Sequence, residues 1–129
     1  MALAFLIGRI VFGLYWLEVA YAHFFKADGL VGYASSKSCK SPKLAVAFTG
    51  ILALLGGLSI LLGAWTATGV VLLVVFLLGV SFKMHAYWKV QDPMAKMGDR
   101  VNFMKNMALI GALLMMLAIA QPWAYSLGF

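Results

Sequence analysis

Four long blocks of apolar residues constrain this chain more than any other feature. They are Ala2–Phe25, Leu44–Gly63, Gly69–Tyr87 and Met104–Gln121. Each is close to the ~20 residues that a helix needs to cross a hydrocarbon core of ~30 Å. No stretch shows the ~10-residue alternation that is typical of a membrane strand. The blocks therefore predict four transmembrane helices, over about residues 2–25, 44–63, 69–88 and 101–121.

The composition supports a membrane protein with little soluble structure. Hydrophobic residues make up 64% of the 129 residues and charged residues 11%, whereas a soluble domain has roughly 45–50% and about 25%. We therefore expect one domain, residues 1–129, folded as an all-α integral membrane four-helix bundle. The first block contains Arg9 and Glu18 and lacks a preceding basic segment, unlike a cleaved signal peptide. We expect it to remain as a helix.

Lysine and arginine gather at one end of the predicted bundle. They occupy the loop after the first helix, and the loop after the third helix with its borders: Lys26, Lys37, Lys40, Lys43, Lys83, Lys89, Lys96, Arg100 and Lys105. The positive-inside rule puts both loops in the cytoplasm and both termini on the non-cytoplasmic side. This topology also accounts for the net charge of +6, so nucleic acid is not an expected partner.

Turn and capping residues indicate where the connecting segments begin and end. A polar loop is expected from Gly29 to about Lys43, and Ser41-Pro42 is a typical helix start. Asp92-Pro93 predicts a short interfacial helix over residues 93–97, which Gly98-Asp99 would end before the fourth span.

Two charges fall inside the predicted spans at matching depth. At a rise of ~1.5 Å per residue, Glu18 and Lys83 each lie about 7 Å from the centre of their helix, toward the cytoplasmic loops. A charge in hydrocarbon is costly and usually marks a function or a buried pair. Equal depth therefore permits an ion pair between the first and third spans.

Other polar side chains reach the same depth or the same surface. With the two charges they form a predicted polar layer: Glu18, His23, Lys83, His85, Trp88, Lys105 and Asn106. Such a layer suits a quinone head group, a proton path or the tail of a partner. The alternative is a structural ion pair with lysines that extend to the interface.

Arg9 lies in the opposite half of the first helix. Nine residues separate it from Glu18, so at ~100° per residue the two side chains face opposite ways. We expect Arg9 to extend to the outer surface, or to meet Gln121, Thr66 or a lipid phosphate.

The residues that bind metals or form disulfides are few. Cys39 is the only cysteine, so the chain has no internal disulfide and no CxxC redox pair. His23 and His85 lie on different helices at similar depth, as bis-histidine haem ligation requires, but no spacing motif supports such a site. We expect no metal, no haem and no covalently bound cofactor.

Several segments, in this order and spacing, resemble the DoxX family of small four-helix membrane proteins. They are residues 9–14, 33–37 with Pro42, 56–64, 85–88 followed by 92–94, and 102–109. Residues 33–42 are similar to the family's YAASKGVP region, and His85 to Trp88 match its HxxW element. Many members carry a glutamate about three residues before the paired glycines. Ala53 stands there in this chain, so the role of that carboxylate is not carried over.

The resemblance implies a subunit of the bacterial-type inner membrane linked to quinone-dependent oxidoreduction, since some members belong to such complexes. The chain has no nucleotide, flavin or cysteine-pair motif, so it would serve as an accessory subunit, perform no catalysis itself and bind quinone in the polar layer. Its partners would be membrane lipids and either a redox protein or further copies of itself.

Two other functions fit the sequence. Small multidrug-resistance transporters also have four short helices and a membrane glutamate in the first, and Glu18 could exchange a proton for a cationic substrate. The opposing features are Lys83 at matching depth and the strong charge bias of the loops. The second alternative is a structural or lipid-binding subunit of a larger membrane complex.

Overall fold

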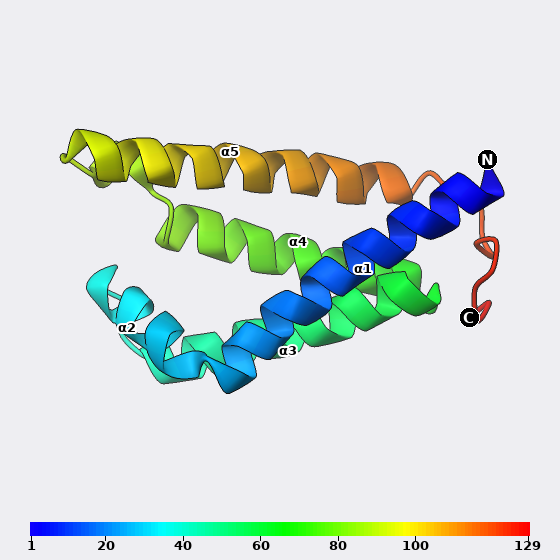
Figure 1. Ribbon diagram of the computed structural model, residues 1–129, viewed down its shortest axis with the longest axis horizontal. Helices are drawn as coiled ribbons and strands as arrows, with labels where there is room; N and C mark the ends of the chain where they lie inside the picture. The colour runs from blue at the N-terminus through cyan, green and yellow to red at the C-terminus, as the bar shows by residue number, and fades with distance from the viewer.

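The computed structural model describes all residues from Met1 to Phe129. The chain contains helices and turns but no strand, which confirms the all-α prediction. Figure 1 shows long helices lying side by side along one axis. The elements in chain order are α1 (Ala2–Phe25), α2 (Ala27–Ser36), α3 (Pro42–Leu62), α4 (Thr66–Lys83), the 3-10 turn η1 (Tyr87–Lys89) and α5 (Pro93–Met116).

Three segments are long and apolar enough to cross a membrane, and α5 completes the bundle. The three are α1, α3 and the stretch Thr66–Lys89, which joins α4 to η1. Helix α5 instead carries four charged residues, and it is continuously apolar only from Met107 to Met116. The charges are Lys96, Asp99, Arg100 and Lys105. The chain is thus a helical membrane bundle in which one helix begins outside the apolar region.

The long helices pack in the order α1, α3, α4, α5. The contacts join α1 to α3, α3 to α4 and α4 to α5, whereas α1 and α5 make no backbone contact. Paired glycines let α3 approach both neighbours closely. A Cβ atom on Gly57 would lie 2.8 Å from the Cβ of Trp16 on α1, and one on Gly56 would lie 2.5 Å from Leu73 on α4. Small residues commonly permit such approach in membranes.

The segment after α1 differs from the predicted polar loop, because residues 27–36 form α2. Gly29, where the polar loop was expected to begin, therefore lies inside a second helix. The reason is an amphipathic pattern that the polar composition obscured. Leu30, Val31 and Ala34 are the more buried residues of α2, which packs on α3. Ser41 precedes α3 as predicted, although its side chain makes no capping hydrogen bond.

The turn between α4 and α5 also differs from the prediction. Helix α4 ends at Lys83, five residues before the predicted end at 88, and the chain then turns through η1. Asp92 starts α5 as predicted, because its side chain accepts a hydrogen bond of 2.9 Å from the backbone N–H of Ala95. Gly98-Asp99 does not end this helix, which continues to Met116. One glycine costs a helix only about 1 kcal/mol.

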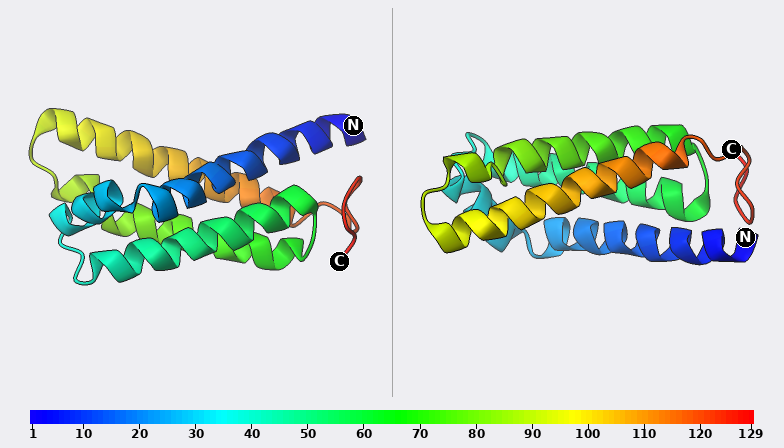
Figure 2. Two further views of the ribbon diagram at one scale, coloured as in Figure 1. Left: turned by 60° about the horizontal axis from the view of Figure 1, so that its bottom comes forward. Right: turned by 90° about the horizontal axis from the view of Figure 1, so that it is seen from above.

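The two ends of the bundle are built differently. Both termini lie at one end, called here the terminal end (Figure 1). The opposite end carries α2, η1 and the first turns of α5, and is called the α2 end. Both views in Figure 2 show the helices running between these ends, with the last residues lying across the terminal end. Which membrane surface each end meets stays a prediction.

Candidate functional site

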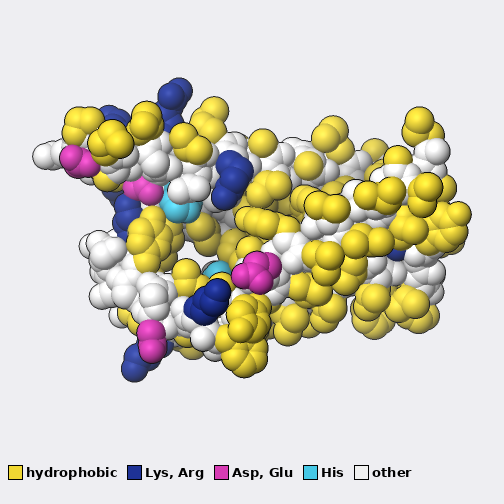
Figure 3. Space-filling model, viewed as in Figure 1, with side chains coloured by type: hydrophobic (Ala, Val, Ile, Leu, Met, Phe, Trp, Pro, Cys, Tyr) yellow, Lys and Arg dark blue, Asp and Glu magenta, His cyan; other side chains and the backbone are white.

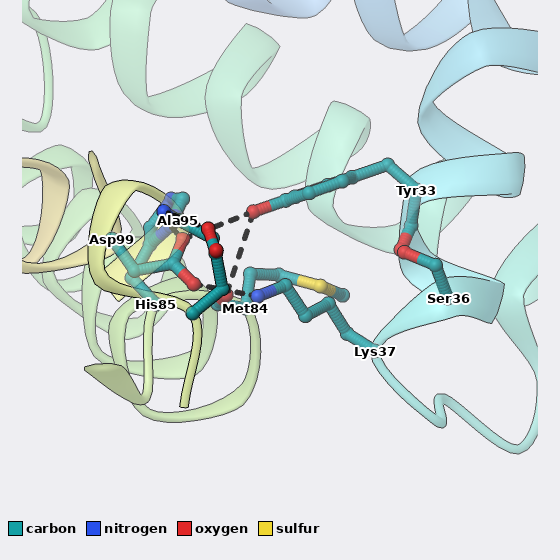
Figure 4. A network of polar contacts seen from close by, with 8 residues as sticks. Tyr33, Ser36, Lys37, Met84, His85, Ala95 and Asp99 are labelled. Carbon is teal, nitrogen blue, oxygen red and sulfur yellow. Dashed lines mark hydrogen bonds and ion pairs between the residues drawn. The ribbon is translucent and has the colours of Figure 1, made fainter. Parts of the chain in front are cut away.

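A buried carboxylate joins three separate segments at the α2 end. Asp99 of α5 is only 6% exposed. Its Oδ2 atom accepts a hydrogen bond of 2.6 Å from Nζ of Lys37, which follows α2. Its Oδ1 atom lies 3.1 Å from Nδ1 of His85 and 3.4 Å from the hydroxyl of Tyr33. Figure 4 shows these side chains converging on Asp99 from α2 and from the turn after α4.

The groups around Asp99 change one another's pKa values. Burial alone would raise the pKa of Asp99, but hydrogen bonds from Lys37 and His85, together with their charges, outweigh it and lower the pKa below its ordinary value. The hydrogen bond to Asp99 raises the pKa of Lys37. Burial, followed by the negative charge of Asp99, raises the pKa of the Tyr33 hydroxyl. The site therefore holds an ionised carboxylate and a protonated lysine across the neutral pH range.

The same carboxylate determines which nitrogen of His85 is free. An ionised carboxylate only accepts hydrogen bonds, so Nδ1 of His85 must donate to Asp99. The other ring nitrogen, Nε2, is therefore the atom of His85 that remains to bind a ligand.

A cavity of about 400 Å³ lies between α2, α3 and α4 beside this carboxylate. Most of its lining is apolar and includes Leu52, Phe76 and Val80. Figure 3 shows the molecule hollowed at the α2 end, with the histidine side chains in cyan at the border of the hollow. The polar or reactive side chains that line the cavity are His23, Tyr33, Cys39, Thr49, Lys83 and His85.

Three residues of the predicted polar layer meet at this cavity. Nδ1 of His23 lies 2.7 Å from the carbonyl of Val19, and its ring lies edge-on to Phe76 at 5.6 Å between centroids. Lys83 donates a hydrogen bond of 3.1 Å to the carbonyl of Ser38. His85 enters from the turn after α4. The structure thus brings both histidines and Lys83 to one apolar space.

The other members of the predicted layer lie outside the cavity. Glu18 and Lys105 are exposed, and neither makes a side-chain hydrogen bond or ion pair. The ion pair that depth alone permitted between Glu18 and Lys83 is not formed, because Lys83 turns toward Ser38. Trp88 is 47% exposed and packs edge-on against Phe103. Asn106 is buried on α5 but does not line the cavity.

Arg9 lies at the other end of the bundle and does not extend to the surface. It is 4% exposed and donates hydrogen bonds to the backbone carbonyls of Ala124, at 2.8 Å, and Tyr125. Its guanidinium also lies 5.9 Å from the ring centre of Trp123. Gln121 and Thr66, which were predicted partners of Arg9, instead bind each other at 2.7 Å. Trp123 is 3% exposed and packs against this guanidinium.

Sequence reasoning missed the acid at the centre of the site. The sequence pattern predicts Asp99 as part of a helix end and Lys37 as a loop cation. One signal was available: the chain has only four acidic residues against ten basic ones. An acid among so many cations at the lysine-rich end was a candidate for pairing. Nevertheless, its partners could not be chosen without knowing that the side chains of Tyr33 and Lys37 reach it from the end of α2.

No three side chains of histidine, cysteine, aspartate or glutamate come together in a position to hold a metal ion. The site presents the chemistry of its own side chains. It offers hydrogen-bond donors at the edge of an apolar space, one ionised carboxylate behind them and one thiol in the wall.

Comparison with known proteins identifies the family to which the chain belongs. Residues 4–86 match the DoxX family, which covers more than half of the chain. The chain therefore belongs to the DoxX family and is a multi-pass inner-membrane protein. It is 32% identical over 122 residues to the inner membrane protein YphA of Escherichia coli strain K12, covering 95% of this chain and 86% of that protein. No solved structure matches the chain.

Proposed function

We propose that this chain is a membrane subunit of a quinone-linked redox system, and that it binds the quinone head group in the cavity at the α2 end. The observation that carries the proposal is the cavity itself: an apolar space between α2, α3 and α4 with His23, Lys83 and His85 in its lining. These three side chains come from α1, from the last residue of α4 and from the turn after α4, and they converge on one place.

The chemistry of a quinone head group suits this lining. The head group is an apolar ring with two carbonyl oxygens, which accept hydrogen bonds but donate none. Nζ of Lys83 is a donor in the lining of this space. Because Nδ1 of His85 donates to Asp99, Nε2 of His85 donates to a quinone oxygen only in the doubly protonated ring. Small-molecule pockets commonly measure about 300–1,000 Å³, and 400 Å³ accommodates a substituted ring with the start of its tail. The rest of an isoprenoid tail would extend into lipid.

The motifs that the sequence lacks indicate which step falls to this chain and which falls to a partner subunit. Electron transfer needs a redox cofactor, and the chain has neither a flavin or nucleotide motif nor a cysteine pair. We therefore assign quinone binding to this chain and electron delivery to a partner subunit. Glu18 lies outside the cavity, so the geometry favours quinone binding over proton-coupled transport by that carboxylate.

The single cysteine provides a direct test, because Cys39 lies in the cavity wall. The protein is reconstituted in lipid nanodiscs, and the rate of Cys39 labelling by N-ethylmaleimide is measured with and without decylubiquinone. This quinone is fully substituted and does not add to thiols. We expect bound quinone to slow labelling at least threefold. Decanol, which has the tail but no quinone ring, should not protect.

Two variants separate head-group recognition from filling of an apolar space. His85→Ala should remove the protection by decylubiquinone while the protein keeps its helical circular dichroism. Glu18→Gln, at similar depth but outside the cavity, should keep the full protection. Equal labelling rates with and without quinone up to its solubility limit, or undiminished protection of the His85→Ala protein, would overturn the proposal.

A further inference from the structure

The first helix leaves a carboxylate facing away from the bundle. Only 17% of the spanning window of α1 is buried, against 39% for α3 and 33% for the third span. Glu18 is exposed on α1 without a hydrogen-bond or ion-pair partner. It lies about 7 Å from the centre of the helix, at ~1.5 Å per residue. A carboxylate facing hydrocarbon at this depth is costly, so a complementary group in the assembled protein is expected to cover it.

The chain itself carries a complementary charge on a neighbouring helix. Lys105 of α5 is exposed, also without a hydrogen-bond or ion-pair partner. It lies about 9 Å from the centre of the predicted fourth span, toward the same α2 end as Glu18. The backbones of α1 and α5 make no contact with each other, so neither charge is satisfied by the neighbouring helix. Figure 3 views this face, where acidic and basic side chains interrupt the hydrophobic surface.

The residues around both charges have matching patterns. On α1 the stripe that contains Glu18 is spaced alternately by three and four residues, as is the stripe on α5 that contains Lys105. Both stripes combine small and apolar residues: Gly8, Val11, Tyr15, Glu18 and Ala22 on α1, and Gly98, Val101, Lys105, Ala108 and Ala112 on α5. No atom lies within 4 Å of a Cβ added to Gly8 or Gly98. Stripes of this kind suit close packing of antiparallel helices.

We infer that this face binds a second copy of the chain, with Glu18 of each copy paired to Lys105 of the other. A two-fold axis along the membrane normal keeps every residue at its depth, so it brings α1 of one copy against α5 of the second. Because the same face serves both copies, the ion pair forms twice. The dimer thus removes two carboxylates and two ammonium groups from contact with lipid.

Disulfide trapping tests the predicted contact. In a Cys39→Ser background, one chain carries Glu18→Cys and a differently tagged chain carries Lys105→Cys. The two are co-expressed, and their membranes are oxidised before solubilisation. We expect a disulfide-linked product that carries both tags. The control replaces Glu18→Cys by Phe48→Cys, an exposed position on α3, and should give at most a tenth of that product.

A doubly substituted chain distinguishes pairing between copies from pairing within one chain. In one outcome the disulfide forms only within the chain that carries both cysteines and never between differently tagged chains. Glu18 and Lys105 would then pair within one bundle, and the inference of a dimer would be wrong. The dimer is also wrong if the two tags are linked no more in the Glu18→Cys pair than in the Phe48→Cys control.

Charge reversal measures whether the ion pair holds the dimer together. Native mass spectrometry in detergent gives the dimer dissociation constant for Glu18→Lys, Lys105→Glu and the double variant. We expect each single reversal to weaken the dimer roughly tenfold and the double reversal to restore it. A monomeric native protein, or a dimer that neither reversal weakens, would overturn the inference.

Discussion

The terminal end and the α2 end both bury charges, but they satisfy them in different ways. At the terminal end Arg9 donates to the backbone carbonyls of Ala124 and Tyr125, and the last residues close over it. The backbone N–H of Trp65 also donates to the carbonyl of Phe129 at 2.7 Å. At the α2 end Asp99 is held only by side chains, which come from two segments, the end of α2 and the turn after α4. Next to it lies a cavity.

The difference indicates which end is structural and which end can respond to conditions. Backbone carbonyls do not titrate, and Arg9 stays protonated at any physiological pH. The terminal end therefore behaves as a fixed clamp on α1, α3 and the C-terminal segment. The partners of Asp99 include Lys37 and Tyr33, whose pKa values are both raised at this site. Flexible or ligand-responsive behaviour is expected at the α2 end.

Substitution of Arg9 at the terminal end should cause the largest loss of stability. Arg9→Met removes two hydrogen bonds from a charged donor and leaves two carbonyls without a partner, each bond being worth roughly 1.5–3 kcal/mol. We expect the free energy of unfolding to fall by about 3 kcal/mol. Thermal unfolding in detergent, followed by circular dichroism, measures the change.

Arg100→Met is the matched control, because Arg100 is exposed and without a side-chain hydrogen bond. Its effect should stay within about 0.5 kcal/mol. If the two arginine variants melt at the same temperature, the terminal end is not a clamp and the contrast between the two ends fails.

The sequence predicted the terminal end less well than the spans. Hydropathy identified α1, α3 and α4 because each is a continuous apolar run, and the lipid solvent selects such runs regardless of tertiary contacts. It also predicted that Arg9 would reach outward. The guanidinium turns inward because residues 122–129 fold back over it, and no local pattern in that segment indicates such a return.

At the α2 end the sequence predicted the depth of the polar residues but not their neighbours. His23, Lys83 and His85 do meet at one cavity, since residues at equal depth on packed helices lie near one another. Glu18 lies at the predicted depth, but it is exposed and does not line the cavity. Depth along a helix does not determine the direction in which a side chain points around the helix axis. Asp99 was missed because two of its three partners, Tyr33 and Lys37, lie on α2 or directly after it, and the apolar side of α2 consists of only a few residues between glycines and serines.

The Asp99 network should give an intermediate effect that depends on pH. The folded-state pKa of Asp99 is lowered, so its stabilising contribution is present above the unfolded pKa of about 3.9 and is lost as pH falls through the folded pKa. The pKa of Lys37 is raised, so its contribution is lost as pH rises through the folded value, above about 10.4. A plateau of stability is expected between these limits.

Asp99→Asn should lower stability on this plateau by about 1 kcal/mol, because Lys37 is partly exposed to solvent and its ion pair is screened. It should also abolish most of the decline on the acid side. Melting temperatures of the native protein, Asp99→Asn and Lys37→Met between pH 3 and pH 9 test both statements. If the melting temperature of the Asp99→Asn protein falls at low pH as much as that of the native protein, other carboxylates cause this loss of stability.

The smallest expected effect is the coupling energy between two groups that lie at the same depth but do not interact. Glu18 and Lys83 lie at matching depth but form no ion pair, and Lys83 donates to Ser38 instead. The losses from Glu18→Gln and Lys83→Met should therefore add within about 0.5 kcal/mol in a double-mutant cycle, whereas those from Asp99→Asn and Lys37→Met should not. Both cycles are measured by thermal unfolding of the detergent-solubilised protein. Coupling between Glu18 and Lys83 as strong as that between Asp99 and Lys37 would show that depth had identified a real pair, and that the α2 end rearranges to form it.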